Sequence, residues 1–337
     1  MNIQKKTIAV FLLLLNILII SSCTRSYPRW QQVSTDHVSI PDITINRYEQ
    51  ALFGLDENNL QNELLSLQNR FPFFLDANLR DSTNINQIYD YLTDPLIKNL
   101  FLESMQVFQD LTLIEDQINL ALKYYRFYLP DEPLPSVYTY ISSLDFQHKI
   151  IATDSILIIA IDTYLGPDFK PYLELGVPMY MIKGFDEKYI VRDCFFALGE
   201  RYLNVNEPGN VLLDLMIYQG KQLYFLDAML PALADNIKIQ YTEEQLLWCQ
   251  QNEENLWKFF IENGLLYSTD IQIMNKFLNE GPFTRGFPGS PAKLGHWLGW
   301  QIVRAYMNNN QDIEFKEMLL NNNAQEILSH SKYKPGR

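Results

Sequence analysis

The sequence has only four histidines, and none of them is placed to form a catalytic zinc site. A zinc-peptidase helix needs two histidines four residues apart on one face, with a glutamate beside the first as the general base. His37, His148, His296 and His330 offer no pair with that spacing. The sequence therefore excludes this zinc-binding helix.

The short motifs of nucleophilic and nucleotide chemistry are also missing. There is no Gly-x-Ser-x-Gly elbow, no phosphate-binding loop, no glycine fingerprint after a strand and no EF-hand loop. The sequence leaves open a catalytic pair of carboxylates of the kind used in glycoside hydrolysis. Asp193 and Glu200 lie on one predicted helix face, and Glu253 and Glu254 lie on another. Because the chain has 40 acidic residues, solvated faces explain these pairs more simply than catalysis.

Positive charge and cysteine are both scarce. The chain has 27 Lys and Arg against 40 Asp and Glu, a net charge of −13. No dense basic stripe exists, so binding of nucleic acid through phosphate neutralisation is excluded. Only three cysteines occur, of which Cys194 and Cys249 lie within apolar helical patterns. A disulfide between them is chemically permitted outside the cytoplasm, but two buried free thiols are favoured.

The first 24 residues have the order of a bacterial lipoprotein signal. Lys5 and Lys6 precede an apolar run over residues 8–20, which Ser21-Ser22-Cys23 follows. The run is too short to span a hydrocarbon layer of roughly 30 Å comfortably. We expect residues 1–22 to be removed and Cys23 to carry acyl chains such as palmitate, each buried methylene adding roughly 0.8 kcal/mol of membrane affinity. Removal deletes two lysines and no acid, which changes the net charge from −13 to −15.

The rest of the chain is predicted to be α+β and predominantly helical, with a small central sheet. Residues 137–141 and 155–161 are β-branched and apolar, which predicts neighbouring strands, the second buried on both faces. A first strand or extended arm is expected near residues 37–45. We expect five regions: a signal peptide over 1–22, a lipidated tether over 23–42, an N-terminal helical region over 43–134, a core of sheet and helices over 135–310, and a polar, weakly helical tail over 311–337.

The C-terminal half carries clear helix signals. Apolar stripes run over residues 190–202 and 212–224, and Pro231 ends the second. Predicted helix starts are Thr242 with Gln245, Thr269 with Gln272, and Ser290-Pro291, the last opening a helix that runs to Tyr306. Within that helix Gly295 and Gly299 are four residues apart, which permits close approach of a neighbouring helix.

Four polar residues within apolar stretches are candidate functional or packing positions. They are Gln219, Lys221, His296 and Arg304. The boundary of a buried face explains Gln219 and Lys221 more simply than a site does, and His296 is more often a packed, hydrogen-bonded residue than a metal ligand. Arg304 either pairs with a buried acid or lies on a partner surface, and the sequence leaves both open.

Several separated blocks of the chain carry a family resemblance. They are residues 162–166 (DTYLG), residues 212–231, residues 248–260 and residues 290–307, which contain GHWLGWQIVRAYM. These blocks, spread over residues 135–307, resemble the GldB family of gliding-motility lipoproteins of Bacteroidetes. The resemblance implies a role in surface gliding or in the envelope machinery that gliding shares with protein secretion. It implies no enzymatic activity.

The family is also distantly similar to predicted zinc peptidases. In those, the first helix after the sheet carries His-Glu-x-x-His, and a later helix supplies a glutamate before a glycine. Here the segment 189–202 has no histidine, and Gln219 stands before Gly220. The resemblance thus implies a degenerate zincin-like fold, a pseudo-peptidase with no catalytic residue, no metal ligand and no cofactor.

Three functional hypotheses follow. The first is a non-enzymatic, membrane-anchored lipoprotein that binds envelope proteins of the motility or secretion machinery and no nucleic acid. The second is a periplasmic, peptidase-like hydrolase with an unrecognised metal or carboxylate site, and the third is a glycan-binding lipoprotein, against which the helical spacing of the tryptophans argues. In the bacteria of this family, lipoproteins that reach the cell surface tend to carry acidic residues soon after the acylated cysteine. Residues 24–29 are basic instead, so we expect the body to face the periplasm, anchored in the outer membrane.

Overall fold

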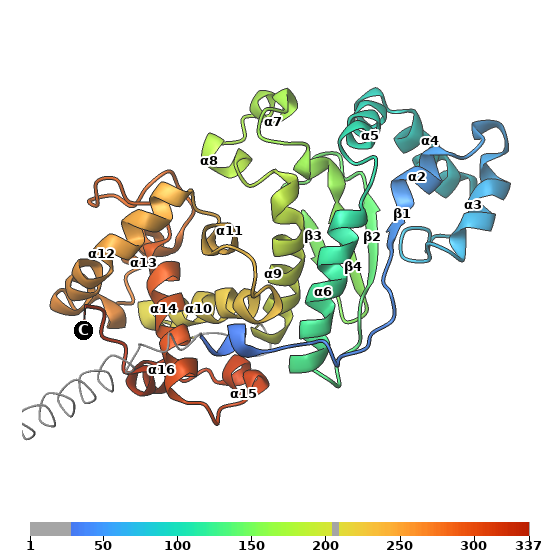
Figure 1. Ribbon diagram of the computed structural model, residues 1–337. Helices are drawn as coiled ribbons and strands as arrows, with labels where there is room; N and C mark the ends of the chain where they lie inside the picture. The colour runs from blue at the N-terminus through green and yellow to red at the C-terminus, as the bar shows by residue number, and fades with distance from the viewer. Residues whose placement is uncertain (1–27, 204–208, 337) are drawn as a thin grey trace, which may run out of the picture. The chain divides into compact units, whose positions relative to one another are not determined.

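A four-stranded mixed sheet in the order β1-β2-β4-β3 organises the fold (Figure 1). Three strands are parallel, namely β1 (Ile45–Arg47), β2 (Ser136–Tyr140) and β4 (Ile156–Ala160), and β3 (Ile150–Ala152) pairs antiparallel with β4 at one edge. The computed structural model describes residues 28–203 and 209–336. The chain divides into two compact units, residues 1–33 and residues 34–337, and we call the second the body.

The two predicted neighbouring strands are confirmed. In their parallel register Val137 lies opposite Leu157 and Thr139 lies opposite Ile159. Four of the five residues of β4 are buried, as predicted for a strand covered on both faces. The first strand begins only at Ile45, at the end of the expected segment 37–45, and the short edge strand β3 was not predicted.

The described α-helices before β2 are α2 (Tyr48–Phe53), α3 (Leu60–Gln68), α4 (Ser82–Thr93), α5 (Pro95–Val107) and α6 (Thr112–Tyr128). Helix α2 packs against β2, whereas α6 packs against the later helices α9 (Ile190–Leu203) and α10 (Leu212–Met229). Leu64, Phe71 and Leu75 form an apolar cluster that reaches Tyr138 of β2. The segment that follows α3 therefore contributes to this core through Phe71, which is completely buried.

The C-terminal half consists of helices that surround two long central ones. Its helices are α7 (Lys170–Glu174), α8 (Met179–Ile182), α9 (Ile190–Leu203), α10 (Leu212–Met229), α11 (Asp235–Ile239), α12 (Glu243–Glu262), α13 (Ile271–Leu278), α14 (Leu294–Asn309), α15 (Phe315–Leu320) and α16 (Ala324–Ser331). Short 3₁₀ turns lie at Arg29–Gln32, Glu57–Asn59, Ile161–Tyr164, Glu187–Tyr189 and Leu265–Tyr267. The fold class is confirmed as predominantly helical α+β.

Helices α10 and α14 cross at two glycines. A Cβ atom built on Gly299 would lie 1.8 Å from the carbonyl oxygen of Met216, and one built on Gly220 would lie 2.3 Å from the carbonyl oxygen of Gly299. Only glycine permits backbones this close. The prediction from the spacing of Gly295 and Gly299 is confirmed, and Gly295 in turn faces Phe277 and Leu278 of α13.

One predicted helix start is confirmed and two are wrong. Thr242 caps α12, and the Thr242 hydroxyl and the Gln245 amide form the reciprocal bonds of a capping box. Helix α13 is capped by Asp270 rather than Thr269, because the Asp270 carboxylate accepts the N–H of Gln272. Helix α14 begins at Leu294, since Ser290-Pro291 is held in a loop in which Thr284 donates to the Pro291 carbonyl.

The C-terminal segment has more structure than a polar tail. Phe315, Met318 and Leu319 of α15 and Ile327 of α16 are buried, and α16 packs against α14 and α10. Because these four residues fall at helical spacing on otherwise polar helices, the overall polarity of 311–337 concealed their packing.

The membrane anchor predicted at Cys23 lies outside the described residues. Within residues 28–203 and 209–336, no helix has the length and apolar character needed to cross a bilayer.

Candidate functional site

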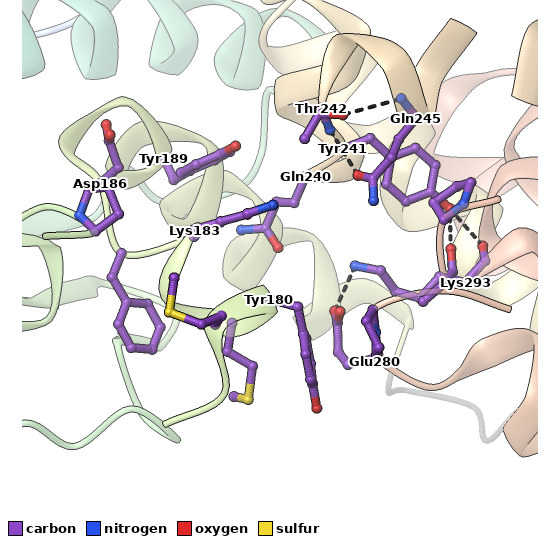
Figure 2. A pocket seen from close by; sticks show the side chains of 18 of the residues that line it. Tyr180, Lys183, Asp186, Tyr189, Gln240, Tyr241, Thr242, Gln245, Glu280 and Lys293 are labelled. Atoms are coloured by element: carbon purple, nitrogen blue, oxygen red, sulfur yellow. Dashed lines mark hydrogen bonds and ion pairs between the residues drawn. The ribbon is translucent and has the colours of Figure 1, made fainter. Parts of the chain in front are cut away.

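A pocket of about 680 Å³ lies in the body where three of its longer helices begin. Asp186 and Tyr189 precede α9, Thr242 and Gln245 open α12, and Lys293 precedes α14, and all five line the pocket (Figure 2). The N-terminus of a helix carries unsatisfied N–H groups and the positive end of the helix dipole. Three such ends favour an anion here, while acids in the first turns of two of the helices, Asp193 in α9 and Glu243 and Glu244 in α12, oppose this effect.

Lysines add to that potential. The lining contains Lys149, Lys183, Lys188 and Lys293. Lys188 Nζ lies 3.6 Å from the Asp186 carboxylate, and Lys293 Nζ lies 2.6 Å from that of Glu280. Figure 2 shows Lys183 extending from the end of α8 into the space beside Gln240. In the part of the chain that the structure describes, Lys183 forms no salt bridge.

Two lining residues hold a backbone conformation that side chains other than glycine rarely adopt. Gln240 has φ of 59° and Lys293 has φ of 56°. Such left-handed residues each cost of the order of 1 kcal/mol, and they persist only where the surroundings enforce them. Here the Tyr241 hydroxyl donates to the carbonyls of Ala292 (2.6 Å) and Lys293 (3.2 Å), which ties the end of α11 to the loop before α14.

A buried ion-pair network centred on Asp193 lies beneath the pocket. The Asp193 carboxylate accepts from Lys149 Nζ at 2.6 Å, Arg192 at 2.9 Å and the Tyr164 hydroxyl at 2.9 Å, and Gln240 adds a fourth donor at 3.2 Å. Burial alone would raise the pKa of Asp193, but the charges of Lys149 and Arg192 outweigh it and hold the pKa below its usual range. The expectation that Asp193 lies on a solvated face is wrong, because α9 packs this residue against the sheet side of the pocket.

A second network explains Arg304. Its guanidinium binds the buried Asp227 carboxylate through two nitrogens, both at 2.7 Å, and it also binds Asp235 at 2.7 and 2.8 Å. Asp227 further accepts from Lys238 Nζ at 2.9 Å and from the Trp300 indole at 2.8 Å. The sequence left two roles open for Arg304, and the structure shows the first of them, pairing with a buried acid.

Two other candidates stabilise helix ends. Lys221 is 2% exposed and donates to the carbonyls of Leu319, at 3.0 Å, and Asn321, at the end of α15, and burial lowers its pKa to about 8. His296 Nε2 lies 2.9 Å from the Leu278 carbonyl at the end of α13, and burial lowers its pKa to about 3, which makes the ring neutral. Both side chains are therefore packed against the C-terminal end of a helix, where the positive charge of Lys221 is favourable.

The four sequence candidates therefore do not come together. Gln219 is half-buried on α10, just before the glycine crossing, and the pocket lining contains neither it nor Lys221, His296 or Arg304. Sequence analysis missed the pocket. Two signals were available in the sequence. The capping box at Thr242 was interpreted only as a helix start, and the Met179-Tyr180-Met181 run between Pro178 and Lys183 was not interpreted.

Across residues 28–203 and 209–336 there is no group of three or more His, Cys, Asp or Glu side chains that could hold a metal ion. Cys194 and Cys249 are buried free thiols, as favoured from the sequence, and burial raises the pKa of both.

Comparison with known proteins identifies a family. A family model described as gliding motility protein GldB matches residues 30–335, whereas no curated protein and no solved structure matches the chain. The match extends the resemblance seen over residues 135–307 to the N-terminal helices α2–α6 and to α15 and α16. The chain therefore belongs to the GldB family of gliding motility proteins.

Proposed function

We propose that this protein is a lipid-anchored, non-enzymatic component of the bacterial envelope that supports gliding, or the secretion machinery associated with it, by contacting other proteins. The observation that carries the proposal is the family match over residues 30–335, which includes nearly the whole body. The match concerns gliding motility, and the anchoring and the mode of action are inferred from the residues.

The anchor is inferred from the signal that ends at Cys23. Small residues precede the cysteine, and the apolar run before it is short, which is the order that lipoprotein processing requires. Several acyl chains on one cysteine hold a protein stably at a bilayer. The basic residues 24–29 support attachment at the outer membrane with the body facing the periplasm.

A non-enzymatic role is supported by what the buried carboxylates already bind. The four donors around Asp193 occupy its oxygens, and its lowered pKa makes it a weak base at neutral pH. Asp227 is engaged in the same way by Arg304 and Lys238. Both acids act as structural counter-ions in this account.

Descent from a peptidase scaffold is part of the proposal. Gln219 stands where related peptidases place a glutamate, and a neutral amide is a poor zinc ligand. Gly220 is retained for a separate reason, since the crossing of α10 with α14 leaves no room for a Cβ atom. Helix α10 therefore needs the glycine for its packing against α14, whereas this structural role does not need a metal ligand at residue 219.

A deletion strain of the source bacterium tests this proposal through colony spreading on soft agar. We expect the deletion to abolish spreading, the wild-type gene to restore it, and Cys23→Ala to fail because its product is unprocessed or released from the membrane. Cys249→Ala is the matched control for loss of a cysteine, and it should restore spreading. A deletion strain that spreads like its parent would refute the proposed role.

A further inference from the structure

Lysines gather in the pocket of this strongly acidic protein. The chain carries a net charge of −13, yet the pocket lining contains four lysines against two acids, Asp186 and Glu280. Two further acids act on these lysines, namely Asp193 on Lys149 and Glu244 on Lys183. The N-termini of α9, α12 and α14 add positive potential at the same place. Low-dielectric walls concentrate the field of such groups within a hollow, which favours an anion there over the rest of this acidic molecule.

An apolar lip adjoins this positive interior. Met179 is 57% exposed, Tyr180 36% and Met181 37%, and all three line the pocket. Leu173 and Leu175, in and just after the neighbouring α7, are 49% and 60% exposed. Exposed apolar side chains gathered in one segment mark interaction surfaces, and methionines suit surfaces that adapt to different side chains.

We propose that the pocket binds the carboxyl-terminal end of a partner polypeptide, with the terminal carboxylate beside Lys183 and the last apolar side chains on the Met179–Met181 lip. This inference rests on the proposed function, because it names the chemistry of the partner that the lipoprotein contacts.

The charges of the pocket select a carboxylate over a neutral group. Lys149, Lys188 and Lys293 each form a salt bridge with a carboxylate. Lys183 extends into the hollow and forms no salt bridge with a described residue, although its charge helps to lower the pKa of the exposed Glu244 at the start of α12. The side chains of Gln240 and Gln245 lie around the same space. Gln240 Nε2 donates to Asp193 and Gln245 Oε1 accepts in the capping box, so the Gln240 amide oxygen and the Gln245 amide N–H are the groups offered to a peptide backbone. The apolar lip on one side and the cations on the other match a chain end that carries both features.

A rigid floor makes the arrangement suitable for recognition. Gln240 is held by its bond to Asp193, and Lys293 is held by Glu280 and by the left-handed turn before α14. Because these side chains are already fixed, less conformational freedom is lost when a ligand binds.

Binding of defined peptide pools to the full chain, solubilised from membranes in detergent, tests the proposal. One pool contains hexapeptides with a free carboxyl terminus and Leu, Met, Phe or Val as the last residue. The second pool has the same sequences with a terminal amide, and the third has the amide and an internal aspartate. Peptides retained by the immobilised chain are identified by mass spectrometry, and the affinity of the best one is measured by fluorescence anisotropy.

We expect retention of free-acid peptides, and an affinity about tenfold or more weaker for the matching amides. Lys183→Gln should weaken binding of the free acid about fivefold, since an exposed cation contributes modestly. Lys258→Gln is the matched control, because Lys258 is an exposed lysine on α12 outside the pocket, and it should leave the affinity unchanged.

Three outcomes would overturn the proposal. The first is no retention of any free-acid peptide. The second is that amidated peptides, with or without the internal aspartate, bind as tightly as the free acids. The third is an equal effect of Lys183→Gln and Lys258→Gln on the affinity. Tyr180→Ala probes the apolar lip separately, and it should reduce the preference for Phe and Met at the last position. None of these outcomes affects the colony-spreading test, so failure of the peptide proposal and failure of the proposed function are distinguishable.

Discussion

Replacement of Gly299 by alanine gives a quantitative test of the helix crossing at the centre of the body. The new Cβ atom would lie 1.8 Å from the Met216 carbonyl oxygen, while real Cβ contacts essentially never fall below 3.0 Å, so the backbones must separate by about 1.2 Å. No rotamer relieves this clash, because both groups are backbone or fixed to it. Overpacking of this kind costs about 3 kcal/mol, at the upper end of the usual range.

The intrinsic helix propensity of alanine opposes this cost. Alanine gains about 1 kcal/mol over glycine in a helix, so the net loss of stability should be about 2 kcal/mol. For a body of some 300 residues the unfolding entropy is roughly 0.6 kcal/mol per degree, and Gly299→Ala should lower the melting temperature by about 3 °C.

The assay is thermal unfolding followed by circular dichroism, with Gly281→Ala as the matched control. Gly281 lies in a loop where the nearest atom to a new Cβ, that of Ala292, is 3.8 Å away, an ordinary contact. The control should melt within about 1 °C of wild type. A melting temperature of Gly299→Ala equal to or above that of wild type would refute the close crossing, because propensity alone predicts an increase.

Three further predictions concern the buried polar groups. Asp227→Asn should lower the free energy of unfolding in urea by about 3 kcal/mol, because it leaves the buried Arg304 undercompensated, and a loss below about 1 kcal/mol would contradict the network. Burial lowers the pKa of His296 to about 3 in the folded chain. Between pH 6.5 and 3 the unfolded chain therefore binds a proton that the folded chain does not, and the free energy of unfolding decreases as the pH is lowered through that window. The stability advantage of wild type over His296→Gln should therefore shrink by roughly 3 kcal/mol from pH 7 to pH 4, and parallel pH profiles would contradict a neutral, buried ring. Cys194 and Cys249 should both react with a thiol reagent only after denaturation and without prior reduction, whereas a requirement for reductant would reveal a disulfide.

The helices and the two central strands could be predicted because their signals are local. Apolar periodicity identified α9 and α10, and the capping box at Thr242 identified the start of α12. The two glycines of α14 predicted a close contact, since their spacing places both on one helix face. The start of α14 was misplaced because Ser290-Pro291 has the local chemistry of a cap, while hydrogen bonds with Thr284 within the same loop hold it outside the helix.

The candidate site could not be predicted for the opposite reason. Lys149, Lys183, Gln240 and Lys293 come from four separate segments, and only the packing of helix ends brings them to one hollow. Arg304 shows the same limit, because its partner Asp227 lies on another helix and no local pattern joins the two. Sequence analysis therefore found polar residues that stabilise the core and missed those that line the pocket.

Single-cell gliding speed in a strain whose only copy carries Lys183→Glu tests the central claim, that this pocket is where the lipoprotein acts. Lys183 is exposed and forms no salt bridge with the described residues, so the variant should fold, reach the membrane at wild-type amounts and yet glide slowly or not at all. Lys258→Glu, with its charge reversed outside the pocket, should glide normally. Normal gliding of the Lys183→Glu strain, with the variant protein present in the membrane, would contradict the account.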